Sequence, residues 1–192
     1  MSARPPGPGD GVTPDGAAPD TPPTGWFDDA AVDAAIRARR SQHDAALRAR
    51  ESATWTGTLT DLAEARRSCQ VRTEAGTAHT GTLDAVADDH LVLRGAGAVT
   101  VLARAAVVAV RVDASGRDLP ATGDRPAPQD RTLDEVLGAW AEDRSPVHAV
   151  LRGGDAVLGT LTAVGVDVVS VTADGGGTVH LPLRAIVAVT VR

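Results

Sequence analysis

The stretch that decides the fold is VLRGGDAVLGTLTAVGVDVVSV, residues 150–171, because an earlier stretch of the chain repeats its pattern. That earlier stretch is VRTEAGTAHTGTLDAVADDHLVL, residues 71–93. Six of the nine residues at positions 81–89 are identical to those at positions 159–167. A match of this length at one spacing indicates an internal duplication.

The match resumes near the end of each copy, where AVVAVRV at 106–112 parallels AIVAVTV at 185–191. The offset between the copies is larger there by one position than it is between Gly81 and Gly159, so we expect one extra residue in the turn DGGG of the second copy. Each copy predicts five short strands, since short apolar runs are bounded by glycine turns. A glycine inside the second strand, Gly81 or Gly159, indicates the sharp bend that closes a small barrel.

Alternation of apolar and polar residues assigns the strand faces. On the second strand we expect Gly81, Leu83 and Ala85 to face the core. On the fifth strand the expected core residues are Val108, Val110 and Val112, matched in the second copy by Val187, Val189 and Val191. The outer face of that strand is also apolar and carries Val107, Ala109, Ile186 and Ala188. We interpret these four residues as an interaction surface, covered by a helix, the sister copy or another chain.

A short amphipathic helix is predicted before each copy. Thr58 and Asp61 have the spacing of a capping box, and so do Thr132 and Glu135. A further helix is expected near the N-terminus, with Asp28 as its N-cap. The predicted organisation is a disordered tail rich in proline and glycine (1–25), an N-terminal helix (26–53), a first copy (54–112), a linker (113–131) and a second copy (132–192).

A short helix followed by five bent strands resembles the Sm-like, SH3-type small barrel. The segments LRGGDAVLGTLTAVGVD at 151–167 and LPLRAIVAV at 181–189 carry this resemblance, which covers about residues 58–112 and 132–192. The arrangement is also similar to paired-barrel proteins of actinobacteria, a similarity that implies no function. The expected fold is therefore mainly β with short helices: two tandem five-stranded Sm-like barrels, an N-terminal helix and a disordered tail.

The resemblance implies RNA binding as one possible function, because Sm-like proteins bind uridine-rich RNA in the pore of a ring. Their first motif places an Asp and an Asn in the loop after the second strand. Here that loop offers Asp88 and Asp89, or Asp167, but no Asn, because the chain contains none. Their second motif is an Arg-Gly pair, whereas Arg104 and Arg184 are each followed by Ala. Both nucleotide-contact motifs are incomplete.

Composition also disfavours RNA. The formal net charge is −6, and the strand regions of the two copies, residues 68–112 and 146–192, contain no aromatic residue on which a base can stack. RNA binding is therefore the alternative function. Its contacts would come from five arginines, Arg72, Arg94, Arg104, Arg152 and Arg184.

No catalytic constellation is found in the sequence. None of the five histidines recurs in the other copy or has the spacing of a metal ligand, so each is interpreted as a surface residue. The single cysteine, Cys69, starts a strand and is interpreted as a buried thiol. We therefore predict no catalytic, metal or cofactor site and no enzyme.

The favoured function is a non-enzymatic interaction or assembly module. A barrel of about 60 residues buries only about 60% of its unfolded surface, so a single copy is marginally stable alone. The expected partner is another protein or a second copy of the chain. The N-terminus lacks the apolar region of a secretory signal, and no apolar run approaches the length of a membrane helix. The expected location is the cytoplasm, without a membrane partner.

Overall fold

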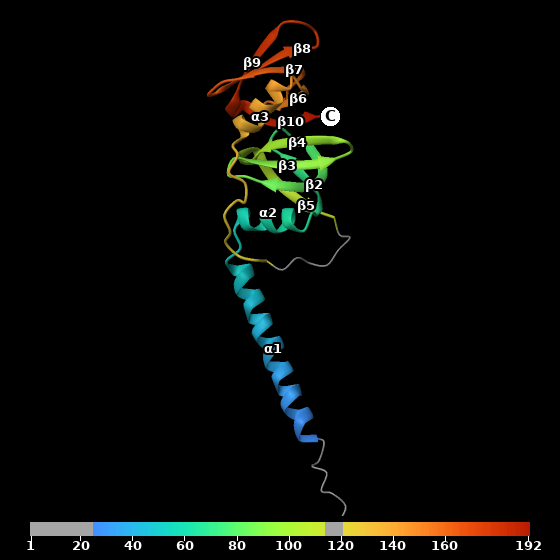
Figure 1. Cartoon of the computed structure of the whole chain (residues 1–192), viewed down its shortest axis with the longest axis vertical. Helices are drawn as coiled ribbons and strands as arrows, with labels where there is room; N and C mark the ends of the chain where they lie inside the picture. The colour runs from blue at the N-terminus through green and yellow to red at the C-terminus, as the bar shows by residue number, and fades with distance from the viewer. Residues whose placement is uncertain (1–24, 114–120) are drawn as a thin grey trace, which may run out of the picture. The chain divides into compact units, whose positions relative to one another are not determined.

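The computed structural model describes residues 25–113 and 121–192, and residues 25–29 through their backbone only (Figure 1). The predicted tail therefore lies outside the described residues as far as Thr24, and so do residues 114–120 of the predicted linker. The chain divides into two units, residues 1–42 and residues 43–192. All the strands belong to the second unit.

Helix α1 (Gly25–Glu51) is a long polar helix. It begins before Asp28, so the predicted N-cap at that residue is wrong. Among the side chains of this helix that the structure describes, Val32, Ile36 and Leu47 are large and apolar, and all three are exposed. No helix among the described residues combines the length and the apolar character that a membrane crossing requires.

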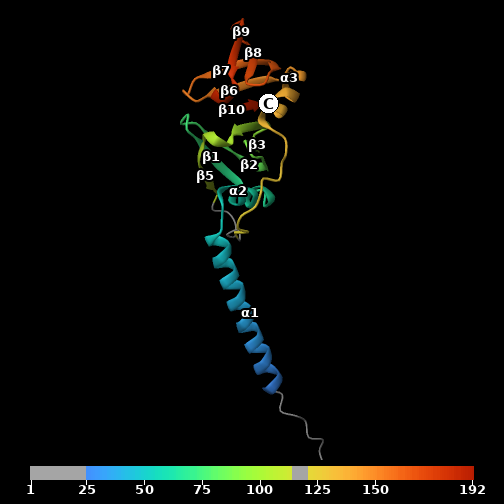
Figure 2. The ribbon, with the colours of Figure 1, turned by 90° about the vertical axis from the view of Figure 1, so that its left-hand side faces the viewer.

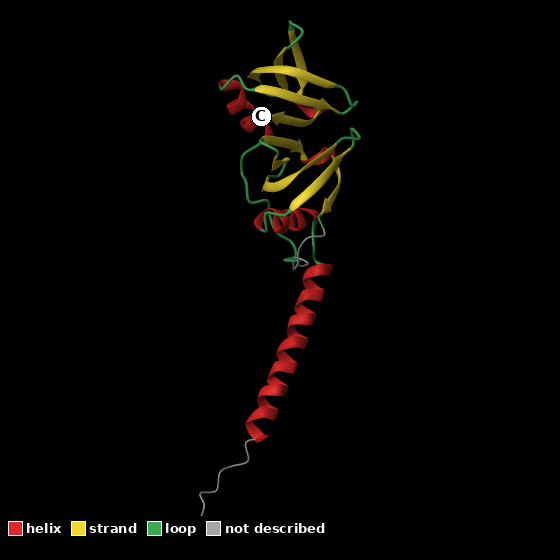
Figure 3. Ribbon diagram, turned by 90° about the vertical axis from the view of Figure 1, so that its right-hand side faces the viewer, coloured by secondary structure: helices red, strands yellow, loops and turns green. Residues whose placement is uncertain are grey.

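The fold of the second unit is mainly β, as the sequence predicts. Its ten strands are antiparallel and form one sheet in the order β5-β1-β2-β3-β4-β10-β6-β7-β8-β9. The strands are drawn in yellow in Figure 3. The first five are β1 (Ser68–Thr73), β2 (Ala78–Val86), β3 (His90–Gly95), β4 (Ala98–Ala103) and β5 (Val107–Val112). The others are β6 (Pro146–Leu151), β7 (Ala156–Val164), β8 (Val168–Ala173), β9 (Thr178–Pro182) and β10 (Ile186–Val191).

The strands fall into two halves with the same order of elements. The first half contains α2 (Trp55–Glu64) and β1 to β5, and the second contains α3 (Leu133–Glu142) and β6 to β10. Helix α2 packs against β2, and α3 packs against β7. The first residue of β1, Ser68, corresponds to Pro146 of β6, and the first residue of β5, Val107, corresponds to Ile186 of β10. The second half has one extra residue in its β8–β9 turn, and every residue of the first half has an equivalent position in the second.

Beta-bulges correct the predicted faces of the fifth strand. Strand β5 carries an extra residue at Val108, opposite the step from Arg72 to Thr73 of β1. A bulge shifts the alternation by one residue. Val107 consequently packs against the core, whereas Val108 is 64% exposed. The predictions that Val108 faces inward and Val107 outward are wrong for this reason, and β10 has the same bulge at Val187.

A second pair of bulges bends the longest strands. Strand β2 carries an extra residue at Asp84 and β7 carries one at Thr162. The shift places Val86 in the core, where the alternation predicted Ala85. Gly81 and Gly159 are buried just before these bulges, at the positions where the sequence indicated a bend.

The two short helices differ in how well their starts were predicted. Helix α3 has the predicted capping box, in which the backbone N–H of Thr132 donates to Glu135 Oε2 over 3.0 Å. Helix α2 begins one turn earlier than predicted, with Thr54 as its N-cap accepting from the N–H of Gly57. Thr58 therefore lies inside the helix, and the capping box predicted there is wrong.

Residues 121–131 of the predicted linker pack along the first half. The N–H of Thr122 donates to Asp61 Oδ2 over 3.1 Å, and Arg125 Nη1 donates to Glu64 Oε2 over 2.9 Å. The hydrogen bond from Arg125 holds the pKa of Glu64 below its usual value. Further along, the N–H of Gln129 donates to the carbonyl of Val86 over 3.2 Å. These contacts hold the chain against the first half directly before α3 begins.

Candidate functional site

The feature that connects the two halves is the pairing of β4 with β10 (Figure 1). We call this contact the internal joint. Its register is Leu102 with Ala188, Val101 with Val189, Thr100 with Thr190 and Val99 with Val191. The hydroxyls of Thr100 and Thr190 lie 3.0 Å apart and are hydrogen-bonded. Both faces of β10 are buried here, and one core cluster runs through both halves.

Polar contacts on either side of the strands complete the internal joint. Asp89 in the loop after β2 accepts a 2.8 Å hydrogen bond from the N–H of Leu133, so it binds the N-terminus of α3. Arg152 of the β6–β7 turn forms a 2.6 Å ion pair with Glu74 of the β1–β2 turn. No structural role for Asp89 or Glu74 was predicted from the sequence. An alignment of the copies alone does not show which loops meet.

His90 corrects another prediction. It is only 2% exposed, whereas the sequence analysis interpreted every histidine as a surface residue. Its Nδ1 donates to Asp89 Oδ1 over 2.7 Å, because an ionised carboxylate can only accept. The carboxylate satisfies the buried ring nitrogen, so burial is tolerated. Asp89 thus joins the core of the first half to the second half.

The four predicted interaction residues lie in two equivalent places. Ile186 and Ala188 are buried in β10 at the internal joint, while Val107 is half-buried and Ala109 exposed in β5. Val108, which was predicted to face the core, is 64% exposed, whereas its equivalent Val187 is fully buried. The apolar face of the fifth strand is therefore covered in the second half and uncovered in the first.

Strands β5 and β9 are the two edges of the sheet within the described part of the chain. There β5 pairs only with β1, and β9 pairs only with β8 (Figure 2). Each edge is the equivalent of one partner in the internal joint, since β5 corresponds to β10 and β9 corresponds to β4. An unpaired edge presents a row of free backbone donors and acceptors to another strand.

Three hollows lie on the surface, one at the internal joint and one at each of the two sheet edges. The joint hollow, about 360 Å³, is lined from the first half by Asp89, Ala103 and Ala105 and from the second by Leu133, Arg152, Val166, Asp167, Leu183, Arg184 and Ile186. The β5 hollow, about 570 Å³, is lined by Trp55, Asp88, Asp89, Arg104, Ala105 and Val107. The β9 hollow, about 320 Å³, is lined by Asp167, Val168, His180, Pro182 and Arg184.

Three of the five arginines predicted for RNA already contact protein groups. Arg94 Nε donates to Asp84 Oδ2 over 2.7 Å, Arg104 Nη2 donates to Thr56 Oγ1 over 2.6 Å, and Arg152 pairs with Glu74. Arg72 and Arg184 are exposed. Arg184 lines the joint hollow together with Arg152. Arg104 and Arg184 do not occupy equivalent positions, because Arg184 stands where the first half has Ala105.

The remaining titratable groups show how burial changes their chemistry. Burial raises the pKa of the Cys69 thiol, and the nearby Asp113 charge adds to this effect, so the predicted buried thiol is confirmed. Burial also lowers the pKa of His79, with a further contribution from the charge of His148. Among the residues that the structure describes, no group of three or more His, Cys, Asp or Glu side chains is placed to hold a metal ion.

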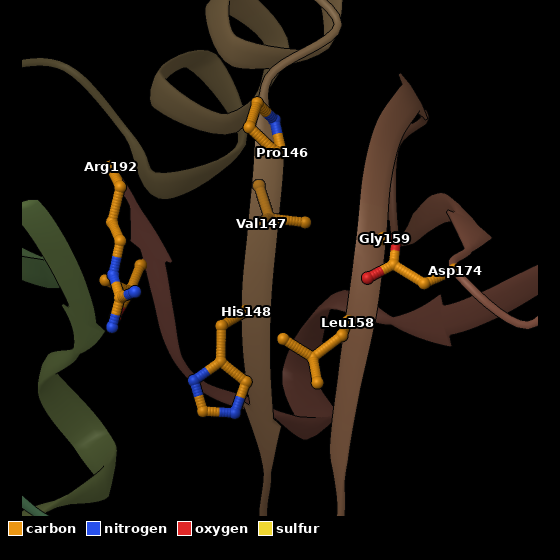
Figure 4. A pocket seen from close by; sticks show the side chains of 8 residues that line it. Pro146, Val147, His148, Leu158, Gly159, Asp174 and Arg192 are labelled. Atoms are coloured by element: carbon orange, nitrogen blue, oxygen red, sulfur yellow. The ribbon is translucent and has the colours of Figure 1, made fainter.

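A further pocket, of about 330 Å³, lies on the second half between β6 and β7 (Figure 4). His148 and Leu158 are paired on these strands and their side chains lie next to each other. Leu158 is exposed, and Arg192 lines the side of the pocket toward β10. The pocket offers an apolar contact beside an imidazole and a guanidinium group.

No model of a known protein family matches the chain, and no curated protein matches it either. The resemblance to Sm-like barrels therefore stays a prediction from the sequence.

Proposed function

We propose that this chain is a non-enzymatic interaction and assembly module, built from two duplicated small barrels of the Sm-like type. The strand order β5-β1-β2-β3-β4 recurs as β10-β6-β7-β8-β9, which supports two copies of one five-stranded unit. Bulges at equivalent positions of β2 and β7 support a strongly bent sheet in each unit. The module works in the cytoplasm with a protein partner.

One observation carries this proposal: the same strand face is buried in one half and exposed in the other. Val187 is fully buried in β10, directly before the residues that pair with β4, while its equivalent Val108 is 64% exposed at the β5 edge. An apolar residue beside an unpaired strand edge is a feature that proteins normally cover. The internal joint is an example, within the same molecule, of how such an edge is covered.

RNA binding, the alternative, has less support. Carboxylates neutralise Arg94 and Arg152, and phosphate contacts supply much of the affinity for nucleic acid. Fluorescence anisotropy with labelled oligo-uridine at about 150 mM salt checks this alternative, because non-specific binding is weak there. We expect no sub-micromolar binding. Such binding, if lost on changing Arg72 and Arg184 to Ala, would favour RNA instead.

The experiment for the proposed function compares the native complexes of three chains. The parent, Val108→Glu and Leu158→Glu are each purified with a tag from the cells that naturally produce the protein, and their masses are measured under native conditions. Leu158 is the matched control, because it is also an exposed apolar residue of a strand but lies on β7, inside the sheet. Circular dichroism checks that all three chains are folded.

We expect the parent and Leu158→Glu in complexes heavier than the 19.6 kDa of one chain. Val108→Glu should lose the complex, because a carboxylate buried without a partner in an interface is strongly unfavourable. A parent of single-chain mass, or an equal complex in Val108→Glu, would show that the β5 edge is not an interaction site.

A further inference from the structure

We infer that the partner at the β5 edge is a second copy of this chain, whose β9 edge repeats the internal joint. The inference rests on the proposed function and names its partner. The two free edges are the equivalents of the two strands already joined within the chain. A contact in which β9 of one copy meets β5 of the next uses each free edge once and leaves the internal joint unchanged.

The equivalence between the halves fixes the register of this contact. Replacing each residue of the internal joint by its equivalent in the other half gives Leu181 with Ala109, His180 with Val110, Val179 with Arg111 and Thr178 with Val112. All eight residues lie within β9 (Thr178–Pro182) and β5 (Val107–Val112). The two edges therefore have the length needed for the same number of paired residues as the internal joint.

The hollows at the two edges match the two sides of the joint hollow. All six residues that line the β5 hollow are equivalents of second-half residues that line the joint hollow. On the other side, the residues equivalent to Asp89, Ala103 and Ala105 are Asp167, Pro182 and Arg184, and these three line the β9 hollow. Each copy thus presents one wall of a joint hollow at each end of its sheet.

At the β5 edge, the start of α2 lacks the carboxylate contact that the start of α3 has at the internal joint. At the internal joint, Asp89 accepts from the N–H of Leu133, and Leu133 is 6% exposed. The equivalent residues are Asp167, which is exposed, and Trp55, which is 43% exposed. The first turn of α2 has no acidic residue of its own, unlike the first turn of α3. A carboxylate from the next copy would supply the missing negative charge.

Charge selects the direction of the contact. Glu74 and Arg152 occupy equivalent turn positions in the two halves and pair with each other at the internal joint. A contact between a second half and a first half again sets Arg152 against Glu74, and the Arg152 guanidinium has donors for two carboxylates. Two first halves would instead bring two Glu74 residues together. The contact is therefore head-to-tail, which leads to a closed ring or an open filament.

Cross-linking between differently marked copies tests the inference directly. The side chains of Thr100 and Thr190 touch at the internal joint, and their equivalents are Val179 and Arg111. Chains with Arg111→Cys and chains with Val179→Cys are mixed and oxidised. We expect a disulfide between them, because directly opposed strand residues come close enough for one. Native Cys69 is buried and stays in all chains as a common background.

The matched control replaces Val179→Cys by His180→Cys, the next residue on β9, whose side chain points to the other face of the sheet. We expect at least a tenfold lower yield of the cross-linked dimer from this mixture. Equal yields from the two mixtures, or no cross-link in either, would overturn the proposed register and partner.

Solution mass of the purified chain gives the second readout. We expect light scattering to show a mass that rises with concentration, and Asp167→Ala to raise the dissociation constant about fivefold through loss of the contact to α2. Asp174→Ala, in the β8–β9 turn, is the control and should leave it unchanged. A parent that stays at single-chain mass would overturn self-association. If Val108→Glu still abolished the complex isolated from cells, the interaction function would stand with a different protein as partner.

Discussion

Gly81 and Gly159 have no room for a side chain, because the backbone of the neighbouring strand passes close to their Cα atoms. A Cβ at Gly81 would lie 2.7 Å from the carbonyl oxygen of Arg94, and one at Gly159 would collide with the carbonyl oxygen of Thr172. The sequence indicated a bend at both positions. The structure adds the close approach of β3 and β8 as the reason that only glycine fits.

We predict that Gly81→Ala and Gly159→Ala each lower the free energy of unfolding by about 1–3 kcal/mol, since the strands must separate to admit the methyl group. Urea unfolding measures the change. Gly138→Ala in α3 is the control, because a Cβ there meets no atom within 4 Å. This variant should be as stable as the parent or more stable, by up to about 1 kcal/mol. Unchanged stability of Gly159→Ala would contradict the close approach.

His79 makes stability depend on pH. Its pKa in the folded chain lies below the usual 6.5, because burial and then the charge of His148 disfavour the protonated ring. Below that pH the unfolded chain binds more protons than the folded chain, so stability falls as the solution is acidified. We predict a smaller loss between about pH 7 and pH 5 in His79→Gln, measured by urea unfolding. The exposed His43→Gln is the control, and equal losses in all three chains would exclude His79 as the source.

The burial of a single residue could be predicted where the alternation of apolar and polar residues around it determines which way its side chain points. Cys69 lies in an alternating strand, and the prediction that its thiol is buried is confirmed. His90 was predicted at the surface, because nothing in the local pattern shows that Asp89 would satisfy its ring in the core. Val108 was placed on the wrong face, since a bulge changes the alternation and depends on the partner strand.

At the scale of elements, helix contacts made by residues nearby in the sequence were predicted, whereas contacts made by distant residues were not. The capping box of α3 is local and was predicted from Thr132 and Glu135. The contact from Asp89 to the start of α3 joins residues far apart in the sequence and leaves no local signal. Loops that meet across the joint could therefore not be predicted from the sequence.

We predict that Asp89→Ala lowers the free energy of unfolding by about 1 kcal/mol or more, because the start of α3 loses an acceptor and His90 loses its partner. Thermal or urea unfolding at low protein concentration measures this loss. Asp167→Ala is the matched control, since Asp167 is exposed and, among the described residues, its carboxylate accepts no hydrogen bond from the start of a helix. Equal effects of the two substitutions would show that the contact to α3 contributes little.

At the scale of the whole molecule, the two halves share one sheet and one core cluster. Each half was predicted as five strands, and the strand pattern of each copy was sufficient for that. The pairing of β4 with β10 was not predicted, because pairing between distant strands is set by the shape of both halves rather than by a short motif. The described linker residues were also expected to be a plain connection, whereas they pack along the first half.

Because the halves share a core, we predict that residues 43–192 unfold in one step. Trp55 reports on the first half and Trp140 on the second, so variants that keep one of them as the sole tryptophan separate the two signals. In each variant, fluorescence and circular dichroism should give the same urea midpoint. A lower midpoint for one tryptophan than for the strand signal of the same variant would mean that the halves unfold independently.

The linker, residues 113–131, gives the internal joint a property that the proposed contact between copies does not have. Tethered strands meet at an effective concentration in about the millimolar range, whatever the amount of protein in solution. A contact between separate copies obeys mass action and comes apart on dilution. Two contacts of the same chemistry thus respond differently to abundance. The internal joint forms at any protein concentration, whereas the number of copies joined through the proposed contact would depend on how much of the chain the cell makes.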